Sequence, residues 1–274
     1  MLGQHEDAKV LAGGHSLLPL MKLRLAMPPV LVDINGIPDL DYLREDQQLG
    51  RLRIGALVRH HDFEVSDLIR DRYPLLWDTA CGIGDPLVRN RGTMAGAVAH
   101  ADPAADWPAA LLALNAEVVA SGPHGERVVP LTELYVAILT TSLSADELLT
   151  EVRVPLPQPR SGGAYEKLER KVGDYAVIGV GAQVVLDEAG TVIEAGIGLC
   201  NAGSMSIKAR DAEAFLVGNP VAPDNVNEAA RLAMEASDPI EDDRGPVDYK
   251  RAMVRELTRR ALRRALERAR GGVA

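Results

Sequence analysis

The sequence predicts an α+β protein of two domains. In the first half of the chain, short apolar runs typical of strands are mixed with helical segments. Residues 155–163 hold three prolines and two glycines and interrupt every periodicity, as an exposed connection does. Three strand-like runs and then three helical segments follow, which is typical of a small antiparallel sheet with helices. The predicted domains are residues 1–157 and 162–270.

The chain is expected to begin with a strand, a small-residue turn and a helix. Residues 9–12 form a short apolar run that predicts a buried strand. Ser16 is placed to cap the next helix, and Pro19 falls in the first turn of that helix, where a missing N–H is tolerated. Residues 30–34 predict a second strand, which Asn35-Gly36 closes with a tight turn.

Further elements of the first domain follow from similar signals. Residues 51–55 predict a strand, and helices are expected around residues 62–69 and from Pro74 to residue 80, because proline suits a first helical position. Asp106 is placed to cap a helix that runs through Leu114. A hairpin is expected from strands at 117–121 and 127–129.

The second domain is expected to contain a sheet followed by helices. The expected strands are residues 164–170, 176–186 and 192–199, and the expected helices are residues 209–216, 226–236 and 249–268.

Composition excludes several classes of function. The 274 residues carry a net charge of -9, which argues against nucleic acid as a partner, because phosphate contacts need clustered Lys and Arg. Cys81 and Cys200 are not in a C-x-x-C arrangement, which argues against a disulfide framework, an iron–sulfur site or a thiolate zinc site. No apolar run approaches the roughly twenty residues of a membrane span, and the first seven residues lack a signal-peptide pattern. The sequence therefore predicts a cytoplasmic protein.

Two segments of small residues, 12–16 and 93–97, are expected to form loops and predict a cradle for a dinucleotide pyrophosphate. Small residues let the backbone approach an anion and direct several N–H groups at it. The Ser16 hydroxyl and the first N–H groups of its helix would also suit a pyrophosphate oxygen. A simple strand-to-helix turn would explain Gly13 and Gly14 equally well from the local pattern alone.

The wider sequence resembles the FAD-binding medium subunit of the molybdenum hydroxylase family. Residues 11–26 and 83–106 are similar to the two FAD signatures of that family. Shorter matches at residues 147–152, 171–176 and 243–251 follow in order, so the resemblance covers nearly the whole chain. The most similar branch is the flavoprotein subunit of carbon monoxide dehydrogenase and its relatives of undefined substrate.

The resemblance implies a two-lobed FAD-binding domain of the vanillyl-alcohol-oxidase type, followed by a small C-terminal domain. It also implies an electron-transfer subunit that takes electrons from two [2Fe–2S] clusters of a small subunit and passes them through FAD to quinone, NAD or dioxygen. A large subunit would hold the molybdenum cofactor, in a dimer of heterotrimers that is cytoplasmic or peripheral at the inner face of the membrane. The alternatives are a xanthine, aldehyde, nicotinate or aromatic-thioester dehydrogenase, or a scaffold subunit that has lost tight FAD binding.

The family's motifs carry over to specific positions, none of them with a catalytic role on the substrate. The cofactor-binding residues implied by the resemblance are Ala12, Gly13, Gly14, His15, Ser16, Leu17, Thr93, Met94, Ala95, Gly96, Ala97, His100, Asp102, Asp106, Leu149, Lys167, Asp174 and Tyr175.

Two departures from the family pattern predict weaker FAD binding. Ala95 and Ala97 stand where the family usually has a glycine and a polar residue, and alanine at positive φ would cost roughly a kcal/mol. Family members also carry an additional strand–helix unit ahead of the first small-residue segment, which here follows only eleven residues.

Several implied residues have a purely structural alternative. His15 and His100 are expected to bond the cofactor or face solvent, not to act as bases. Asp102 precedes a proline and would suit a turn. Asp106 is expected to bond FAD as well as cap its helix.

The second half of the chain contributes four implied residues. Leu149 has an ordinary core leucine as its alternative. Lys167 would stabilise an anionic reduced flavin, but its charged neighbours fit a solvated face equally well. Asp174 and Tyr175 are expected in a loop that faces the flavin.

Overall fold

A five-stranded antiparallel sheet forms the centre of the N-terminal domain in the computed structural model, which describes residues 2–5 and 7–271. Its strand order is β3-β4-β9-β5-β6. The strands are β3 (Leu43–Asp46), β4 (Arg51–Gly55), β5 (Glu117–Gly122), β6 (Gly125–Pro130) and β9 (Leu148–Pro155). The predicted strand at 51–55 and the predicted hairpin are confirmed. The middle strand β9 was not predicted, because a β-bulge at Thr150 within it disturbs the alternation of buried residues.

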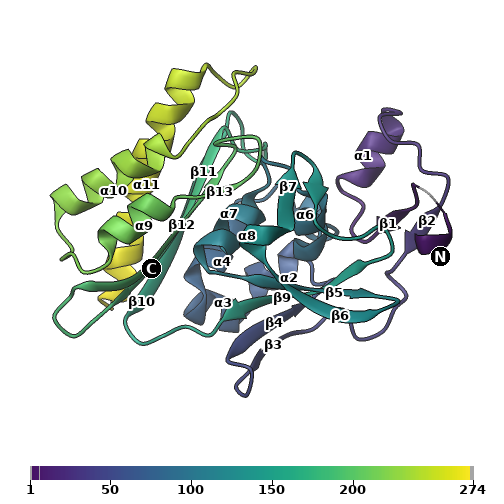
Figure 1. Cartoon of the computed structure of the whole chain (residues 1–274), viewed down its shortest axis with the longest axis horizontal. Coiled ribbons are helices and arrows are strands. Elements are labelled where there is room, and N and C mark those ends of the chain that lie inside the picture. The colour runs from purple at the N-terminus through teal and green to yellow at the C-terminus, as the bar shows by residue number, and fades with distance from the viewer. Residues whose placement is uncertain (1, 6, 272–274) are drawn as a thin grey trace.

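A small lobe lies beside this sheet, on the side of the molecule away from the C-terminal helices (Figure 1). In it β1 (Lys9–Leu11) pairs in parallel with β2 (Leu31–Asp33), and α1 (Leu17–Lys22) follows β1. Ser16 occupies the N-cap position of α1 but makes no capping hydrogen bond, because its backbone is helical and not extended. The capping role predicted for Ser16 is therefore wrong.

Short helices fill the space between the five-stranded sheet and the C-terminal domain. They are α2 (His60–Val65), α3 (Asp67–Arg72), α4 (Pro74–Cys81), α5 (Pro86–Arg89), α6 (Met94–His100), α7 (Asp106–Ala113) and α8 (Leu131–Leu134). The first domain also contains a 3-10 turn (Leu2–Gln4) and a hairpin of β7 (Tyr135–Ala137) and β8 (Thr140–Thr141). The single helix expected at 62–69 is two helices, because the Ser66 hydroxyl caps a new helix at the Ile69 N–H. Pro74 begins α4 as predicted.

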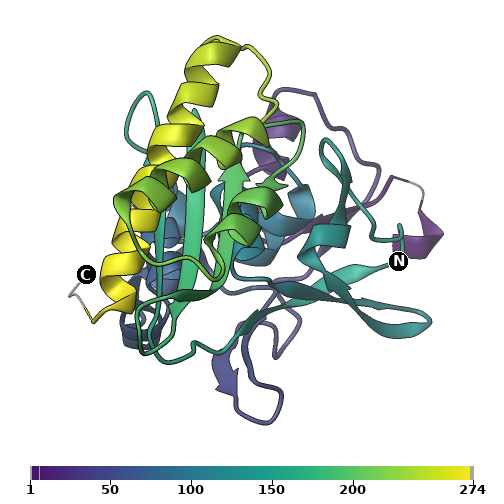
Figure 2. The ribbon, with the colours of Figure 1, turned by 60° about the vertical axis from the view of Figure 1, so that its left-hand side comes forward.

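The C-terminal domain is an antiparallel sheet with the order β10-β11-β12-β13. Its elements are β10 (Ser161–Leu168), β11 (Ile178–Leu186), β12 (Val192–Cys200), β13 (Ile207–Lys208), α9 (Arg210–Leu216), α10 (Pro223–Glu235) and α11 (Val247–Ala269). Helices α9, α10 and α11 cover one face of the sheet (Figure 2), whereas α4 and α7 of the first domain pack on the other face. The predicted α+β architecture is confirmed, with three expected strands and three expected helices present in the second domain.

The two domains meet through backbone contacts that leave no room for side chains. A Cβ at Gly198 or at Gly196 would lie 1.9 Å from a carbonyl oxygen of α7. On the neighbouring side, Asp78 of α4 accepts hydrogen bonds from Arg264 and Arg268 of α11. Because atoms pack this closely, loops of the second domain are held in fixed positions against the first.

No helix in the described part of the chain combines the length and apolarity that crossing a bilayer requires.

Candidate cofactor-binding site

The first small-residue segment lies against the residues just ahead of the second. Gly13 is buried, and a Cβ on it would lie 2.3 Å from the carbonyl oxygen of Arg91 and 2.8 Å from Cα of Gly92. The backbone of the first segment therefore touches the residues just ahead of the second. This contact exists only because position 13 has no side chain.

Gly14 is required for a different reason, its backbone conformation. Its φ of +74° lies in the left-handed region, which residues with a Cβ rarely adopt. Its carbonyl oxygen accepts from the N–H of Leu18, the second residue of α1. The first segment thus turns sharply while exposing backbone, as close approach to a ligand requires.

The second segment is a helix and not a loop, which corrects the sequence analysis. Thr93 is the N-cap of α6, and its hydroxyl accepts from the Gly96 N–H at 3.1 Å. Ala95 has no positive φ, so the expected strain at this alanine is wrong. Met94 and Ala95 point into the core, at 0% and 2% exposure. Thr93 is 3% exposed as well, whereas Gly96 and Ala97 are half-buried.

Ala95→Gly is therefore expected to lower stability and leave FAD affinity unchanged. Glycine in a helix costs about 1 kcal/mol relative to alanine. Thermal unfolding and flavin fluorescence titration would measure the two effects, and a clearly tighter FAD complex in the variant would contradict the helical assignment.

Two residues that the sequence analysis missed connect the segments. The Arg59 guanidinium donates to the Arg91 carbonyl oxygen and to Asn35 Oδ1, and Asn35 Nδ2 donates to the Ala12 carbonyl oxygen at 2.9 Å. In the sequence, the dipeptide Asn35-Gly36 predicted only a tight turn and gave no sign of this contact.

The histidines near the cradle do not form an acid–base pair. His15 is exposed, and its Nδ1 lies 3.0 Å from the Gly13 carbonyl oxygen. His60, which the sequence analysis missed, is buried beneath Gly92 and accepts from Trp107 Nε1. Burial lowers the pKa of His60 to about 3, so this ring is neutral and structural at physiological pH.

His100 and Asp102 lie where α6 ends. His100 is the last residue of α6, and Ala101 turns the chain with a φ of +56°. The Asp102 carboxylate accepts from the Ala104 N–H at 2.9 Å, so the turn role that we considered as the alternative is present.

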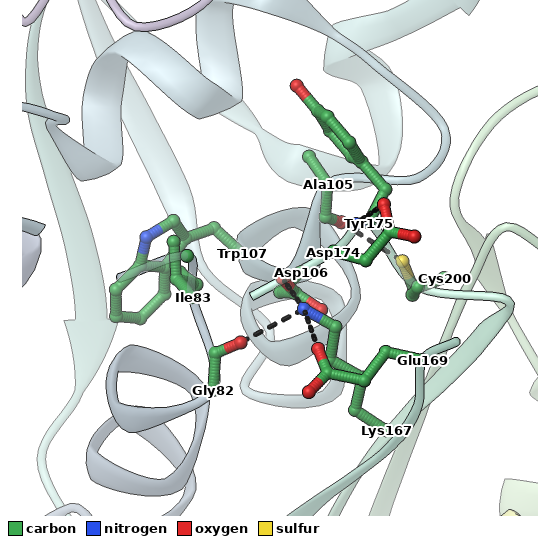
Figure 3. A network of polar contacts seen from close by, with 12 residues as sticks. Gly82, Ile83, Ala105, Asp106, Trp107, Lys167, Glu169, Asp174, Tyr175 and Cys200 are labelled. Carbon is green, nitrogen blue, oxygen red and sulfur yellow. Dashed lines mark hydrogen bonds and ion pairs between the residues drawn. The ribbon is translucent and has the colours of Figure 1, made fainter. Parts of the chain in front are cut away.

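Asp106 does not cap α7, so the capping role predicted for it is wrong, as it is for Ser16. Ala105 is the N-cap, and Asp106 is the first residue of the helix with its carboxylate 7% exposed at the domain junction. There it accepts from the Tyr165 hydroxyl at 2.8 Å and from Lys167 Nζ at 3.0 Å. Figure 3 shows the Lys167 ammonium between Asp106, Glu169 and the Gly82 carbonyl oxygen. The solvated face considered for Lys167 is wrong.

Burial dominates the electrostatics of this pair. It raises the pKa of Asp106, and the Lys167 charge and hydrogen bond oppose that shift only in part. Burial alone would lower the pKa of Lys167, but the Asp106 carboxylate outweighs it and raises that pKa. Lys167 is thus a charged group whose hydrogen bonds are made within the chain. Cys200 Sγ lies nearby at 3.3 Å from the Ala105 carbonyl oxygen, and burial raises its pKa as well.

Tyr175 reaches the first segment from the second domain. Partial burial and the Asp102 carboxylate raise the pKa of Tyr175, whereas its contact with the Ser16 hydroxyl lowers it. Asp174 holds this loop, because its carboxylate accepts from the Tyr175 N–H at 2.8 Å and from Arg244 Nη2 at 3.4 Å. Leu149, in contrast, is 4% exposed within the apolar core of the first domain.

The structure therefore brings Ser16, Asp102 and Tyr175 together around the first small-residue segment. It places Asp106 and Lys167 below them at the domain junction. Within the described residues there is no group of His, Cys, Asp and Glu side chains arranged to hold a metal ion. The arrangement can bind and enclose a dinucleotide through backbone groups, hydroxyls and one aromatic ring.

Known proteins match the chain over most of its length. Residues 1–157 match the family described as the FAD binding domain in molybdopterin dehydrogenase, and residues 163–265 match the CO dehydrogenase flavoprotein C-terminal domain. The carbon monoxide dehydrogenase medium chain of Hydrogenophaga pseudoflava is 42% identical over 270 residues, covering 98% of this chain and 93% of that protein.

Two further matches agree in extent. The 6-hydroxypseudooxynicotine dehydrogenase complex subunit alpha of Paenarthrobacter nicotinovorans is 40% identical over 265 residues, covering 97% of this chain and 89% of that protein. A solved carbon monoxide dehydrogenase from Hydrogenophaga pseudoflava, which lacks the Mo-pyranopterin moiety of the molybdenum cofactor, superposes with a TM-score of 0.94 at 43% identity. That superposition covers 97% of this chain and 92% of the other.

Proposed function

The chain belongs to the family of FAD-binding subunits of molybdopterin dehydrogenases, and from this premise we propose that it is the electron-transfer subunit of a molybdenum-containing dehydrogenase. Its role in that assembly is to hold FAD, which when bound accepts electrons from [2Fe–2S] clusters of a small subunit and releases them to an external acceptor. A large subunit holds the molybdenum cofactor and oxidises the substrate.

The observation that carries this proposal is the contact of Gly13 with Arg91 and Gly92. It joins two chain segments into one cradle, in which the half-buried Gly14, Ser16 and Gly96 leave the backbone within reach of a ligand. Such a surface fits a pyrophosphate, which needs close backbone approach more than it needs bulky side chains. Tyr175 is placed to cover the cofactor from the second domain.

The chain's own residues bind and shield the cofactor and perform no proton transfer on a substrate. His60 is neutral and buried, and the carboxylate of Asp106 is committed to Lys167 and Tyr165. We place the protein in the cytoplasm, in a dimer of heterotrimers with quinone, NAD or dioxygen as acceptor. A peripheral position at the inner face of the membrane would come from the complex.

We propose a carbon monoxide dehydrogenase as the holoenzyme, because the medium chain of that enzyme matches this chain nearly end to end. A second candidate is a dehydrogenase of a nitrogen-containing aromatic compound, favoured by the similar match to the 6-hydroxypseudooxynicotine dehydrogenase subunit. The substrate meets the large subunit, so assaying the complex with carbon monoxide and with such a compound separates the two. A complex that turns over substrate without bound flavin would indicate a scaffold subunit instead.

The chain supplied with FAD but without its partner subunits is expected to be reduced by dithionite and not by carbon monoxide or an organic substrate. Electrons can reach its flavin only from a cluster on another chain. Flavin absorbance under anaerobic conditions measures this, and substrate is expected to bleach the flavin once both partner subunits are added. Bleaching by substrate with this chain alone would contradict the assignment.

A further inference from the structure

We propose that Arg59, held by Asn35, ties the two halves of the cradle together and, with Arg91, supplies the positive charge that binds the diphosphate of FAD. This inference rests on the proposed function and assigns roles to side chains of this chain outside the two small-residue segments.

The first step is the position of the guanidinium. Arg59 Nη1 donates to the Arg91 carbonyl oxygen at 2.5 Å, and Nη2 donates to Asn35 Oδ1 at 2.6 Å. Asn35 Nδ2 in turn donates to the carbonyl oxygens of Ala12, at 2.9 Å, and Leu11, at 3.4 Å. One guanidinium therefore connects the end of β1, the turn after β2 and the residues ahead of α6.

The second step is that the backbone around Arg59 is held independently of its side chain. Arg59 N–H donates to the Asp62 carboxylate at 2.7 Å, His60 N–H donates to the Gly92 carbonyl oxygen at 3.0 Å, and Arg59 forms an isolated antiparallel bridge with Thr93. The N-terminus of α2 is thus fixed to the second segment. The side chain extends from this anchor toward the first segment.

The third step is that the Arg59 and Arg91 guanidiniums form no ion pair with the residues that the structure describes. In the described part of the chain, no carboxylate lies within ion-pair distance of Arg59 or Arg91, whereas Arg89 and Arg53 each pair with a glutamate. The charge of Arg91 contributes to lowering the pKa of Asp33, but Asp33 Oδ1 accepts its hydrogen bonds from Asn35. Burial lowers the pKa of Arg59 and repulsion from Arg91 adds to that shift, whereas the Asp62 carboxylate opposes it only in part. Two like charges held together in an acidic protein are stabilised when an anion binds between them.

The fourth step matches this charge to a diphosphate. A guanidinium carries five N–H donors, and in the described part of the chain protein groups use only two of those on Arg59. Arginine binds phosphate oxygens through paired, charge-assisted hydrogen bonds. Because Arg91 contributes its carbonyl oxygen to the cradle and its guanidinium makes no hydrogen bond in the described structure, both cations are available to the same anion.

The test uses the complex of this chain with its partner subunits and measures the FAD dissociation constant by flavin fluorescence at several NaCl concentrations. Arg59→Gln is expected to raise the dissociation constant about tenfold or more and to flatten its salt dependence, because a charge-assisted contact is lost. Arg59→Lys is expected to keep the salt dependence but bind less tightly, because ammonium cannot bridge two acceptors in this geometry. Asn35→Ala is expected to weaken binding at unchanged salt dependence.

Arg91→Gln removes an exposed side chain and leaves the backbone contact, so this variant is expected to fold and to show the flattened salt dependence by itself. Arg70→Gln, at an exposed ion pair on α3, is the matched control and is expected to bind FAD as wild type does. This inference would be overturned if Arg59→Gln and Arg91→Gln both kept the wild-type salt dependence and Asn35→Ala kept the wild-type affinity for FAD. The proposed function would stay intact. A wild-type complex that binds no FAD would refute the proposed function itself.

Discussion

Gly13→Ala is expected to abolish tight FAD binding. The added Cβ would lie 2.3 Å from the Arg91 carbonyl oxygen, a backbone atom that cannot rotate away, so the two segments must separate. We expect the FAD dissociation constant to rise at least about 100-fold, equivalent to about 2.7 kcal/mol. The fold is expected to survive, because α1 contributes no buried residue and the main cores lie elsewhere. Flavin content of the purified complex and fluorescence titration measure the effect.

Gly36→Ala provides a matched control in the same lobe. A Cβ at Gly36 meets no atom within 4 Å, and its φ is not positive, so this alanine adds the same methyl group without a clash. It is expected to bind FAD as wild type does. Equal flavin content in Gly13→Ala and Gly36→Ala, at equal thermal stability, would refute the two-segment cradle.

Lys167→Met is expected to destabilise the protein more than any other change considered, by about 3–5 kcal/mol at neutral pH. The substitution keeps the length of the side chain and removes the ammonium, which leaves the Asp106 carboxylate buried at the domain junction with only the Tyr165 hydroxyl as donor. Denaturant unfolding of the variant and wild type measures the difference. A loss of less than about 1 kcal/mol in the free energy of unfolding would contradict this expectation, because exposed ion pairs contribute that little.

The pH dependence of that loss has a definite sign. Burial already raises the pKa of Asp106 above its unfolded value, and removing the Lys167 cation raises it further. A carboxyl whose pKa is raised in the folded state destabilises that state when it is ionised and not when it is protonated. The difference in the free energy of unfolding between wild type and Lys167→Met is therefore expected to shrink as pH falls toward the unfolded pKa of about 3.9. Asp106→Asn in the same chain is expected to recover most of the lost stability at neutral pH. A double variant no more stable than Lys167→Met would contradict this account.

The small-residue segments illustrate how far sequence reasoning reaches. Glycine at 13 and 14 and the match to known FAD signatures predicted that distant segments share one site. In the structure Gly13 contacts Arg91 and Gly92, just ahead of the second segment. The conformation of the second segment was predicted wrongly, because the motif was interpreted as a loop. The Thr93 cap and helix-forming alanines favour α6, and these local signals were present at residues 93–97.

Charged residues were harder to assign, because their roles depend on contacts between domains. Asp106 fits an N-cap in the sequence, yet Ala105 takes that position and the carboxylate meets Lys167, sixty-one residues away. Arg59 and Asn35 carry no motif at all, and only the meeting of three chain segments gives them a place beside the cradle.

By itself the sequence determined the α+β class, the order of most strands and helices, the family and the cofactor, because periodicity, glycine positions and motif order are local properties of the chain. The tertiary structure alone decided which face of each segment is exposed, that Lys167 is paired and buried, and that Arg59 and Arg91 lie together without an ion pair among the described residues. Burial and the distances between charges set these properties, and both arise only when segments distant in sequence pack against each other.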